Sequence, residues 1–324
     1  MGDFVLKAPF PYFGGKSRCA SLVWECFGNV PNYVEPFFGS GAVLLGRPHE
    51  PGIETVNDID CFLANFWRSM QADPEATAKA ADRPVNEADL QAIHNWLVTR
   101  EEFRERMKTD IDYYDPLIAG RWCWGLCCWI GSGWCACDAG QGVNRQLPHL
   151  GDAGQGVNRQ LPHLGNAGQG VNRQLPHLGN AGRGGIYEYF DALAARLRRV
   201  RVACGDWSRV LTPSVTEKSG LTGVFLDPPY SEGNMKYSAG SGNGAEVSTA
   251  VREWAIANGD NPMLRIALCG YEGNHKMPDS WECVAWKAHG GYSARKGKSN
   301  GNGNDKRERI WFNKSCLISK GLFA

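Results

Sequence analysis

Short apolar runs alternate with helical patterns along much of this chain. Strands are predicted at residues 33–35 and 54–56, and again at 200–204, 223–226 and 264–268. Apolar residues at helical spacing fill 186–197, and a helix-like stretch covers 246–257. Alternation of strands and helices predicts an α/β fold with an open, mostly parallel sheet of the Rossmann-like kind.

The region from about residue 61 to 185 interrupts this alternation. From Asn86, a suitable N-cap, apolar side chains recur at helical spacing as far as Phe103 and predict one helix. We therefore expect a first catalytic part over residues 1–61, a mainly helical insert over 62–185, and a second catalytic part over 186–324.

A tandem repeat lies within that insert. The unit A-G-Q-G-V-N-R-Q-L-P-H-L-G-D begins at Ala139, recurs from Ala153 and Ala167 with a spacing of 14, and is truncated from Ala181. A glycine-rich unit of this length buries little apolar surface. We interpret residues 139–182 as an expanded surface loop from a recent duplication, although the arginine of each copy could also contact phosphates.

Composition narrows the class of protein. The 324 residues are 43% hydrophobic with a formal net charge of +1, so any affinity for nucleic acid must come from local patches. No apolar stretch approaches the roughly 20 residues of a membrane helix, and no secretory signal is present. The 12 cysteines are therefore expected to be reduced thiols in a cytoplasmic protein of a bacterium or a phage-infected host cell.

A glycine-rich turn follows the first predicted strand. V-E-P-F-F-G-S-G ends at Gly41, directly before residues 42–45, which can begin a helix. Nucleotide-like cofactors bind at such a turn because glycine lets a ligand approach the backbone and the helix N-terminus offers free amides. An ordinary tight turn is the alternative.

A carboxylate follows about 20 residues later, at the end of the next strand. Asp58 has the spacing at which an acid accepts hydrogen bonds from ribose hydroxyls. The same residue could instead cap the helix predicted at 61–70.

The tetrapeptide D-P-P-Y follows the apolar strand at 223–226. Asp227 supplies a hydrogen-bond acceptor, the two prolines stiffen the loop, and Tyr230 offers a flat ring. Such a platform suits an exocyclic amine, whose hydrogens would bind Asp227 and the Pro228 carbonyl. A surface turn is the alternative for this tetrapeptide alone.

Taken in order, Y-F-G-G-K, V-E-P-F-F-G-S-G, N-D-I-D and D-P-P-Y resemble the DNA adenine methylase (Dam) family of adenine-specific methyltransferases. The resemblance implies S-adenosylmethionine as methyl donor, N6 of adenine in double-stranded DNA as acceptor, base flipping, and a target-recognition insert. It implies cofactor contacts from Tyr12, Lys16, Glu35, Pro36, Phe37, Gly39, Gly41, Asp58, Asp206 and Asp227, and catalysis by Asp227, Pro228, Pro229 and Tyr230.

Other readings stay open from the residues alone. A relative acting on cytosine N4 or RNA would more often carry serine at Asp227, and a non-catalytic DNA-binding relative need not keep D-P-P-Y. The tryptophans and cysteines of residues 121–137 could stack on bases, but we interpret them as the core of the insert and predict no metal. The basic stretch 295–298 could contact phosphates. Further partners are a cognate restriction endonuclease and a weakly bound second copy, if the protein is not a monomer.

Overall fold

The computed structural model describes residues 6–10, 12, 16–85, 87–129, 134–135, 184–229, 244–286 and 307–317. Within this part of the chain one sheet of seven strands has the order β3-β2-β1-β4-β5-β7-β6. Its strands are β1 Asn32–Glu35, β2 Ile53–Asp58, β3 Val200–Cys204, β4 Thr222–Leu226, β5 Leu264–Tyr271, β6 Glu282–Ala285 and β7 Glu308–Phe312. The first five pair in parallel, and β7 is antiparallel to β5 and β6. The predicted Rossmann-like, mostly parallel sheet is therefore confirmed.

The middle of the sheet contains a topological switch point. β1 pairs with β2 on one side and with β4 on the other, so the chain runs outward from β1 in both directions. The carboxyl ends of β1 and β4 are therefore neighbours, although most of the chain separates them in sequence. In open α/β sheets ligands bind in the crevice outside such an edge.

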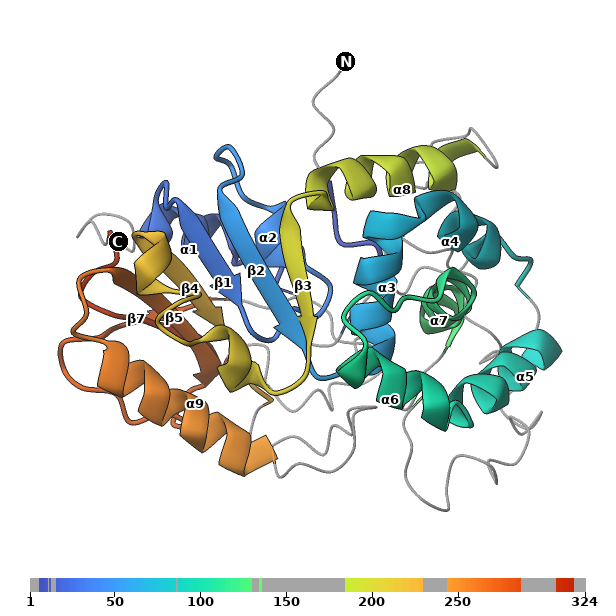
Figure 1. Ribbon diagram of the computed structural model, residues 1–324. Helices are drawn as coiled ribbons and strands as arrows, with labels where there is room; N and C mark the ends of the chain where they lie inside the picture. The colour runs from blue at the N-terminus through green and yellow to red at the C-terminus, as the bar shows by residue number, and fades with distance from the viewer. Residues whose placement is uncertain are drawn as a thin grey trace.

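Helices flank the sheet and form a separate layer beyond β3 (Figure 1). Near the sheet are α1 Ala20–Phe27, α2 Ala42–Leu45 and α9 Gly244–Asn258, with 3-10 turns η1 Trp207–Val210 and η2 Glu217–Ser219. The helices beyond β3 are α3 Cys61–Ala72, α4 Pro74–Ala81, α5 Glu87–Val98, α6 Glu101–Thr109, α7 Pro116–Cys128 and α8 Gly184–Leu197. None of the helices that the structure describes is long and apolar enough to cross a membrane.

The prediction of a single helix from Asn86 to Phe103 was wrong. α5 ends at Val98, and Phe103 belongs to the separate helix α6. The hydroxyl of Thr99 binds the carbonyls of Asn95 and Trp96, and Arg100 has a non-helical backbone. Side-chain bonds of this kind compete with helix propagation, and the periodicity of apolar residues does not register them. Asn86 itself lies outside the described residues.

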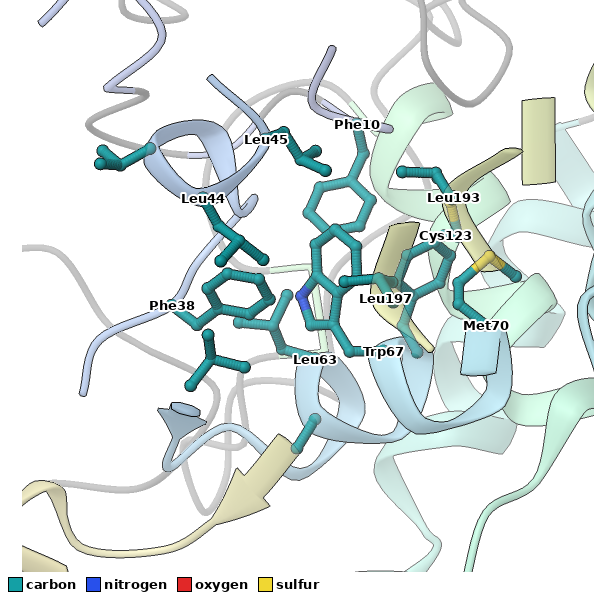
Figure 2. Close-up of a cluster of buried hydrophobic side chains, with 14 of the residues drawn as sticks. Phe10, Phe38, Leu44, Leu45, Leu63, Trp67, Met70, Cys123, Leu193 and Leu197 are labelled. Carbon is teal, nitrogen blue, oxygen red and sulfur yellow. The ribbon is translucent and has the colours of Figure 1, made fainter. Parts of the chain in front are cut away.

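A shared apolar core joins the helical layer to the sheet (Figure 2). The Trp67 ring of α3 lies close to Phe38, in the turn after β1, with ring centroids 4.9 Å apart. The close-up adds side chains from α2, α3, α7 and α8 around this pair, namely Leu44, Leu45, Leu63, Met70, Cys123, Leu193 and Leu197. The turn that follows β1 is therefore held from the side of the predicted insert.

The tryptophans and cysteines of α7 lie inside this layer. Trp122, Cys123, Trp124 and Cys127 are at most 2% exposed, and the Trp134 indole Nε1 donates to the Trp122 carbonyl at 3.0 Å. Their interpretation as core, in preference to a base-stacking surface, is confirmed for these residues. The repeat at 139–182 and the basic stretch at 295–298 lie outside the described part of the chain.

Candidate active site

The turn after β1 needs its glycines. Gly39 and Gly41 have φ angles of 50° and 69°, a region that side chains with a Cβ rarely adopt. A Cβ at Gly39 would lie 3.1 Å from Cδ1 of Tyr12. The structure therefore places the tyrosine of the first motif directly against the glycine-rich turn, where the missing side chain of Gly39 leaves room for the tyrosine ring.

Asp58 fixes that turn. Its Oδ2 accepts a hydrogen bond from the Gly39 amide at 3.1 Å, and its Oδ1 accepts from the Asp60 amide at 3.0 Å. Burial raises the pKa of the Asp58 carboxyl to about 7, and the two amides oppose this rise. The helix-capping alternative for Asp58 fails, because Asp60 caps α3 through the amides of Phe62 and Leu63.

Asn57 links the turns that follow two strands, a role that the sequence analysis missed. Its buried side chain donates to the carbonyls of Pro36 at 3.1 Å and Gly205 at 3.0 Å. The Gly205 amide also donates to the Asp58 carbonyl at 3.1 Å. The loops after β1, β2 and β3 thus form one connected edge. The position of Asn57 within N-D-I-D is the sequence feature that could have identified this role.

Aromatic rings lie at the outer end of this edge. The Phe37 ring from the β1 turn stacks on Trp207, with centroids 6.4 Å apart and planes at 25°. Asp206 is exposed beside Trp207 and begins η1 by accepting from the Ser208 amide at 3.0 Å. Asp206 is thus available at the surface of the edge, next to a flat aromatic surface.

An ion pair connects the first motif to the D-P-P-Y motif. Lys16 Nζ lies 2.9 Å from Oδ2 of Asp227, which directly follows β4. The lysine is 5% exposed, and its carbonyl accepts the amides of Cys19 and Ala20 at the start of α1. Burial lowers the pKa of Lys16, but the carboxylate of Asp227 raises it, and the resulting pKa lies well above the usual range for lysine. Lys16 therefore remains a cation.

Further carboxylates surround this pair. Burial raises the pKa of Glu35 at the end of β1 well above its usual range, with Asp227 and Asp58 adding to the rise, although the Tyr33 hydroxyl donates to Oε2 at 2.8 Å. Buried Glu308 of β7 also contributes to the raised pKa of Lys16. Burial and the neighbouring carboxylates thus favour the neutral form of Glu35, whereas Asp227 forms the ion pair with Lys16.

The far side of Lys16 is aromatic. Its Nζ lies 5.7 Å from the ring centroid of Trp286, which follows β6 and is 8% exposed. The Trp286 indole nitrogen is buried without a hydrogen-bond partner among the described residues. The sequence analysis missed both Trp286 and Glu308, because neither lies in a glycine-rich or proline-rich motif.

The predicted site residues thus fall along one edge of the sheet. Tyr12 lies with the β1 turn and Asp58, and Lys16 with Asp227, while Asp206 contacts its own turn at the end of β3. Pro228 is buried, Pro229 is partly exposed, and Tyr230 lies outside the described residues. Among the residues described, no group of three or more His, Cys, Asp or Glu side chains could hold a metal ion.

One comparison with known proteins identifies a family. Residues 12–130 match the family model of D12 class N6 adenine-specific DNA methyltransferases. The match includes the first motif, the β1 turn and Asp58, and it ends before Asp206 and Asp227. No curated protein matches the chain.

Proposed function

The chain is a D12 class N6 adenine-specific DNA methyltransferase, and on this premise we propose that the carboxyl edge of its sheet holds S-adenosylmethionine beside the target adenine. The enzyme methylates N6 of adenine in DNA. The observation that carries the proposed site is the contact between Lys16 and Asp227, since it joins the cofactor-side motif to D-P-P-Y.

The residues present fit this cofactor. Gly39 in the glycine-rich turn has no Cβ, and Tyr12 lies against its backbone. Asp58 offers carboxylate oxygens for ribose hydroxyls, and Asp206 with Phe37 would hold the adenine ring. When bound, S-adenosylmethionine supplies an electrophilic methyl group.

Asp227 and its loop would orient the acceptor nitrogen. The Asp227 carboxylate and the Pro228 carbonyl accept hydrogen bonds from the exocyclic amine, which directs the nitrogen lone pair toward the methyl group. Lys16 Nζ lies 2.9 Å from Oδ2 of Asp227 and holds this side chain in place after β4. Pro229 stiffens the loop and Tyr230 would stack on the base. The nitrogen would form a bond to the methyl carbon as the carbon–sulfur bond breaks and a thioether is left, and it would then release one proton.

The substrate is proposed to be duplex DNA. An adenine within a duplex cannot reach an enclosed site until it is flipped out of the stack, which costs a few kcal/mol that stacking in the site offsets in part. The helical layer beyond β3 would position the duplex as a target-recognition domain. We also propose that the enzyme acts in the cytoplasm as a monomer or weak dimer. A cognate restriction endonuclease is the proposed protein partner.

The first experiment identifies the product and the role of Asp227. Purified protein is incubated with radiolabelled S-adenosylmethionine and unmethylated duplex DNA, and the labelled nucleoside is identified after digestion. We expect N6-methyladenine from the wild type. Asp227→Ala should lower the rate by at least about 10²-fold, because it removes an acceptor that positions the amine.

Asp260→Ala is the matched control. Asp260 also pairs with a lysine, Lys314 at 2.7 Å, but it is 85% exposed and lies away from the crevice. We expect wild-type rates from this variant. Undiminished transfer by a folded Asp227→Ala protein would contradict the role given to Asp227, and label found only in another nucleoside would contradict the proposed site as a whole.

A further inference from the structure

Three arginines gather around two tryptophans in the helical layer, far along the chain from the D-P-P-Y motif. The guanidinium carbons of Arg100 and Arg121 lie 4.2 Å and 4.7 Å from the ring centroid of Trp96. The guanidinium carbon of Arg83 lies 5.8 Å from the ring of Trp124, whose indole nitrogen donates to the Arg83 carbonyl. We call these residues the arginine cluster.

The fold brings these groups together from separate elements. Trp96 lies on α5, Arg121 and Trp124 lie on α7, and Arg83 and Arg100 lie in the links after α4 and α5. Buried Leu90, Ile93 and Leu97 fix α5 in the apolar core. Packing of the helices therefore determines the positions of the three guanidinium groups and holds them close together against their mutual repulsion.

Positive charge in the cluster is only partly neutralised. Arg83 pairs with Asp89 at 3.4 Å, whereas Arg100 and Arg121 have no ion-pair partner in the described part of the chain. Burial lowers the pKa of Arg121, and the charges of Arg83 and Arg100 lower it further, while Asp115 opposes this shift only in part. The Nε atoms of Arg83 and Arg121 are buried and lack hydrogen-bond partners among the described residues. An anion bound to the accessible part of these guanidinium groups would offset the unbalanced positive charge.

Another arginine of the helical layer, Arg106, also packs on an aromatic ring but has a charged partner. The guanidinium carbon of Arg106 lies 3.8 Å from the Tyr113 ring centroid, which resembles the packing of Arg100 on Trp96. Arg106 also pairs with Asp110, one turn later on its own helix, at 3.4 Å. Stacking on an aromatic ring is thus common to both sites, but the excess of positive charge is particular to the arginine cluster.

The cluster also lies on the appropriate side of the molecule. Figure 1 shows α5 and α6 on the side toward which the carboxyl ends of the parallel strands run, with α3 leading from Asp58 into this layer. A duplex bound across the crevice would meet these helices. With a net charge of only +1, the chain needs local patches of this kind to bind a polyanion.

We propose that the arginine cluster is a binding site for phosphate groups of the DNA backbone, flanking the adenine that enters the active site. Guanidinium groups bind phosphate oxygens in a bidentate manner, and stacking on Trp96 orients them in advance. Contacts of this type position the duplex without reading its sequence. The inference rests on the proposed function only in taking duplex DNA as the ligand.

Salt dependence of DNA binding tests the proposal. Affinity for a short fluorescein-labelled duplex is measured by anisotropy over a range of salt concentrations, for wild type, Arg100→Gln, Arg121→Gln and Arg106→Gln. Loss of one phosphate contact lowers the slope of log affinity against log salt by about 0.9. We expect this loss from Arg100→Gln and from Arg121→Gln, by the same factor on duplexes of different sequence, and none from Arg106→Gln.

Arg106→Gln removes the same charge as the other two variants, so an equal shift in all three would attribute the effect to net charge and overturn the site. Unchanged slopes for Arg100→Gln and Arg121→Gln, or a wild type that binds no duplex, would overturn it as well. Arg121 is partly buried, and Arg121→Lys provides a variant that keeps the charge if Arg121→Gln does not fold. Arg100 is exposed and carries the test by itself.

The failure of this inference differs from that of the proposed active site. A wild-type protein with the expected slopes but no methyl transfer would contradict the chemistry assigned to Asp227 and leave the arginine cluster in place. Normal methyl transfer with slopes that none of the arginine variants changes would do the reverse.

Discussion

At the residue scale, the site concentrates acidic side chains around one buried lysine. Asp227 and Glu308 raise the pKa of Lys16, and Asp227 and Asp58 raise the pKa of Glu35. Such crowding costs stability unless a ligand or a partner compensates for it. Perturbed pKa values of this kind are typical of functional sites, and they give the site a measurable dependence on pH.

The pKa of Asp58 predicts how cofactor binding responds to pH. Because burial raises it to about 7, the carboxylate that would accept ribose hydroxyls is lost as pH falls through that value. The KM for S-adenosylmethionine should therefore be constant well above pH 7 and rise by up to about tenfold for each unit below it. Steady-state kinetics at several pH values measure this directly.

Asp58→Asn separates this effect from the titration of other groups. The amide still accepts one hydrogen bond but does not titrate, so its KM should be raised and flat across the same pH window. Wild-type KM values that do not change on acidification would show that the ionised Asp58 does not hold the cofactor. A slope that persists in Asp58→Asn would assign the titration to another group, such as Glu35.

Motifs predicted the residues of this site better than their contacts. Tyr12, Lys16, Asp58 and Asp227 were identified because each lies in a short, unusual pattern. Asn57, Trp286 and Glu308 were missed, since their importance depends on tertiary neighbours: two backbone carbonyls for Asn57 and a buried cation for the others. A single sequence does not contain those distances.

At the element scale, close helix packing decides which substitutions the helical layer tolerates. Gly120 lies on α7 where this helix crosses α4, and a Cβ there would lie 2.5 Å from both the Ala80 Cβ and the Thr77 carbonyl oxygen. The side chains of α4 are small at this crossing, which allows the two backbones to approach. The carbonyl oxygen is backbone and has little freedom to move away.

Gly120→Ala should therefore destabilise the protein, although alanine is ordinarily the better helix former. We expect the free energy of unfolding to fall by about 1–3 kcal/mol because of overpacking, measured by urea denaturation. Leu117→Ala changes an exposed side chain of the same helix and should stay within about 0.5 kcal/mol of wild type. Stabilisation by Gly120→Ala, as helix propensity alone predicts, would show that α4 and α7 do not pack this closely.

Elements were predictable where one periodicity dominates. All five parallel strands were predicted, and β4 and β5 most directly, because strands buried on both faces read as nearly continuous hydrophobic segments. β6 was not, since Val284 is the one buried side chain of its four residues. The boundary between α5 and α6 was missed because it depends on the Thr99 hydroxyl and not on hydrophobicity.

At the scale of the whole molecule, a buried charge network joins the two catalytic parts of the chain. Both carboxylate oxygens of Glu54 on β2 bind Arg196 of α8, at 2.6 Å and 2.9 Å, and one also binds Arg47 at 3.1 Å. The Glu54 and Arg47 side chains are 1% exposed and that of Arg196 is 14% exposed. The helical layer is therefore attached to the sheet by charge as well as by apolar packing.

Glu54→Gln should destabilise the fold strongly, because it leaves two buried guanidinium groups without a counter-charge. Removing one partner of a buried ionic group costs about 3–5 kcal/mol, and the midpoint of urea denaturation should fall accordingly. Glu272→Gln is the control: its pair with Arg309 involves a carboxylate that is 65% exposed, and about 1 kcal/mol or less is expected. Equal effects of the two variants would contradict the importance given to burial.

Sequence reasoning predicted that both ends of the chain share one sheet, because strand patterns occur on both sides of residues 61–185. It could not predict that Glu54 would meet Arg196, since pairing of distant charges requires the fold to be known. It did not predict the order of the strands, which follows from the pairing of β1 with β2 and β4.

The position of β1 between β2 and β4 has a consequence for protein synthesis. One edge of β1 can pair with β2 as soon as both have left the ribosome, but the other edge must wait for residue 222. At roughly 5–20 residues per second, translation from β1 to β4 takes about 10–40 s. During that interval the unpaired backbone edge of β1 is open to wrong partners. Each copy of the 14-residue repeat prolongs this interval. The number of copies therefore affects how long β1 waits for β4 during synthesis, independently of any role of the repeat in the folded enzyme.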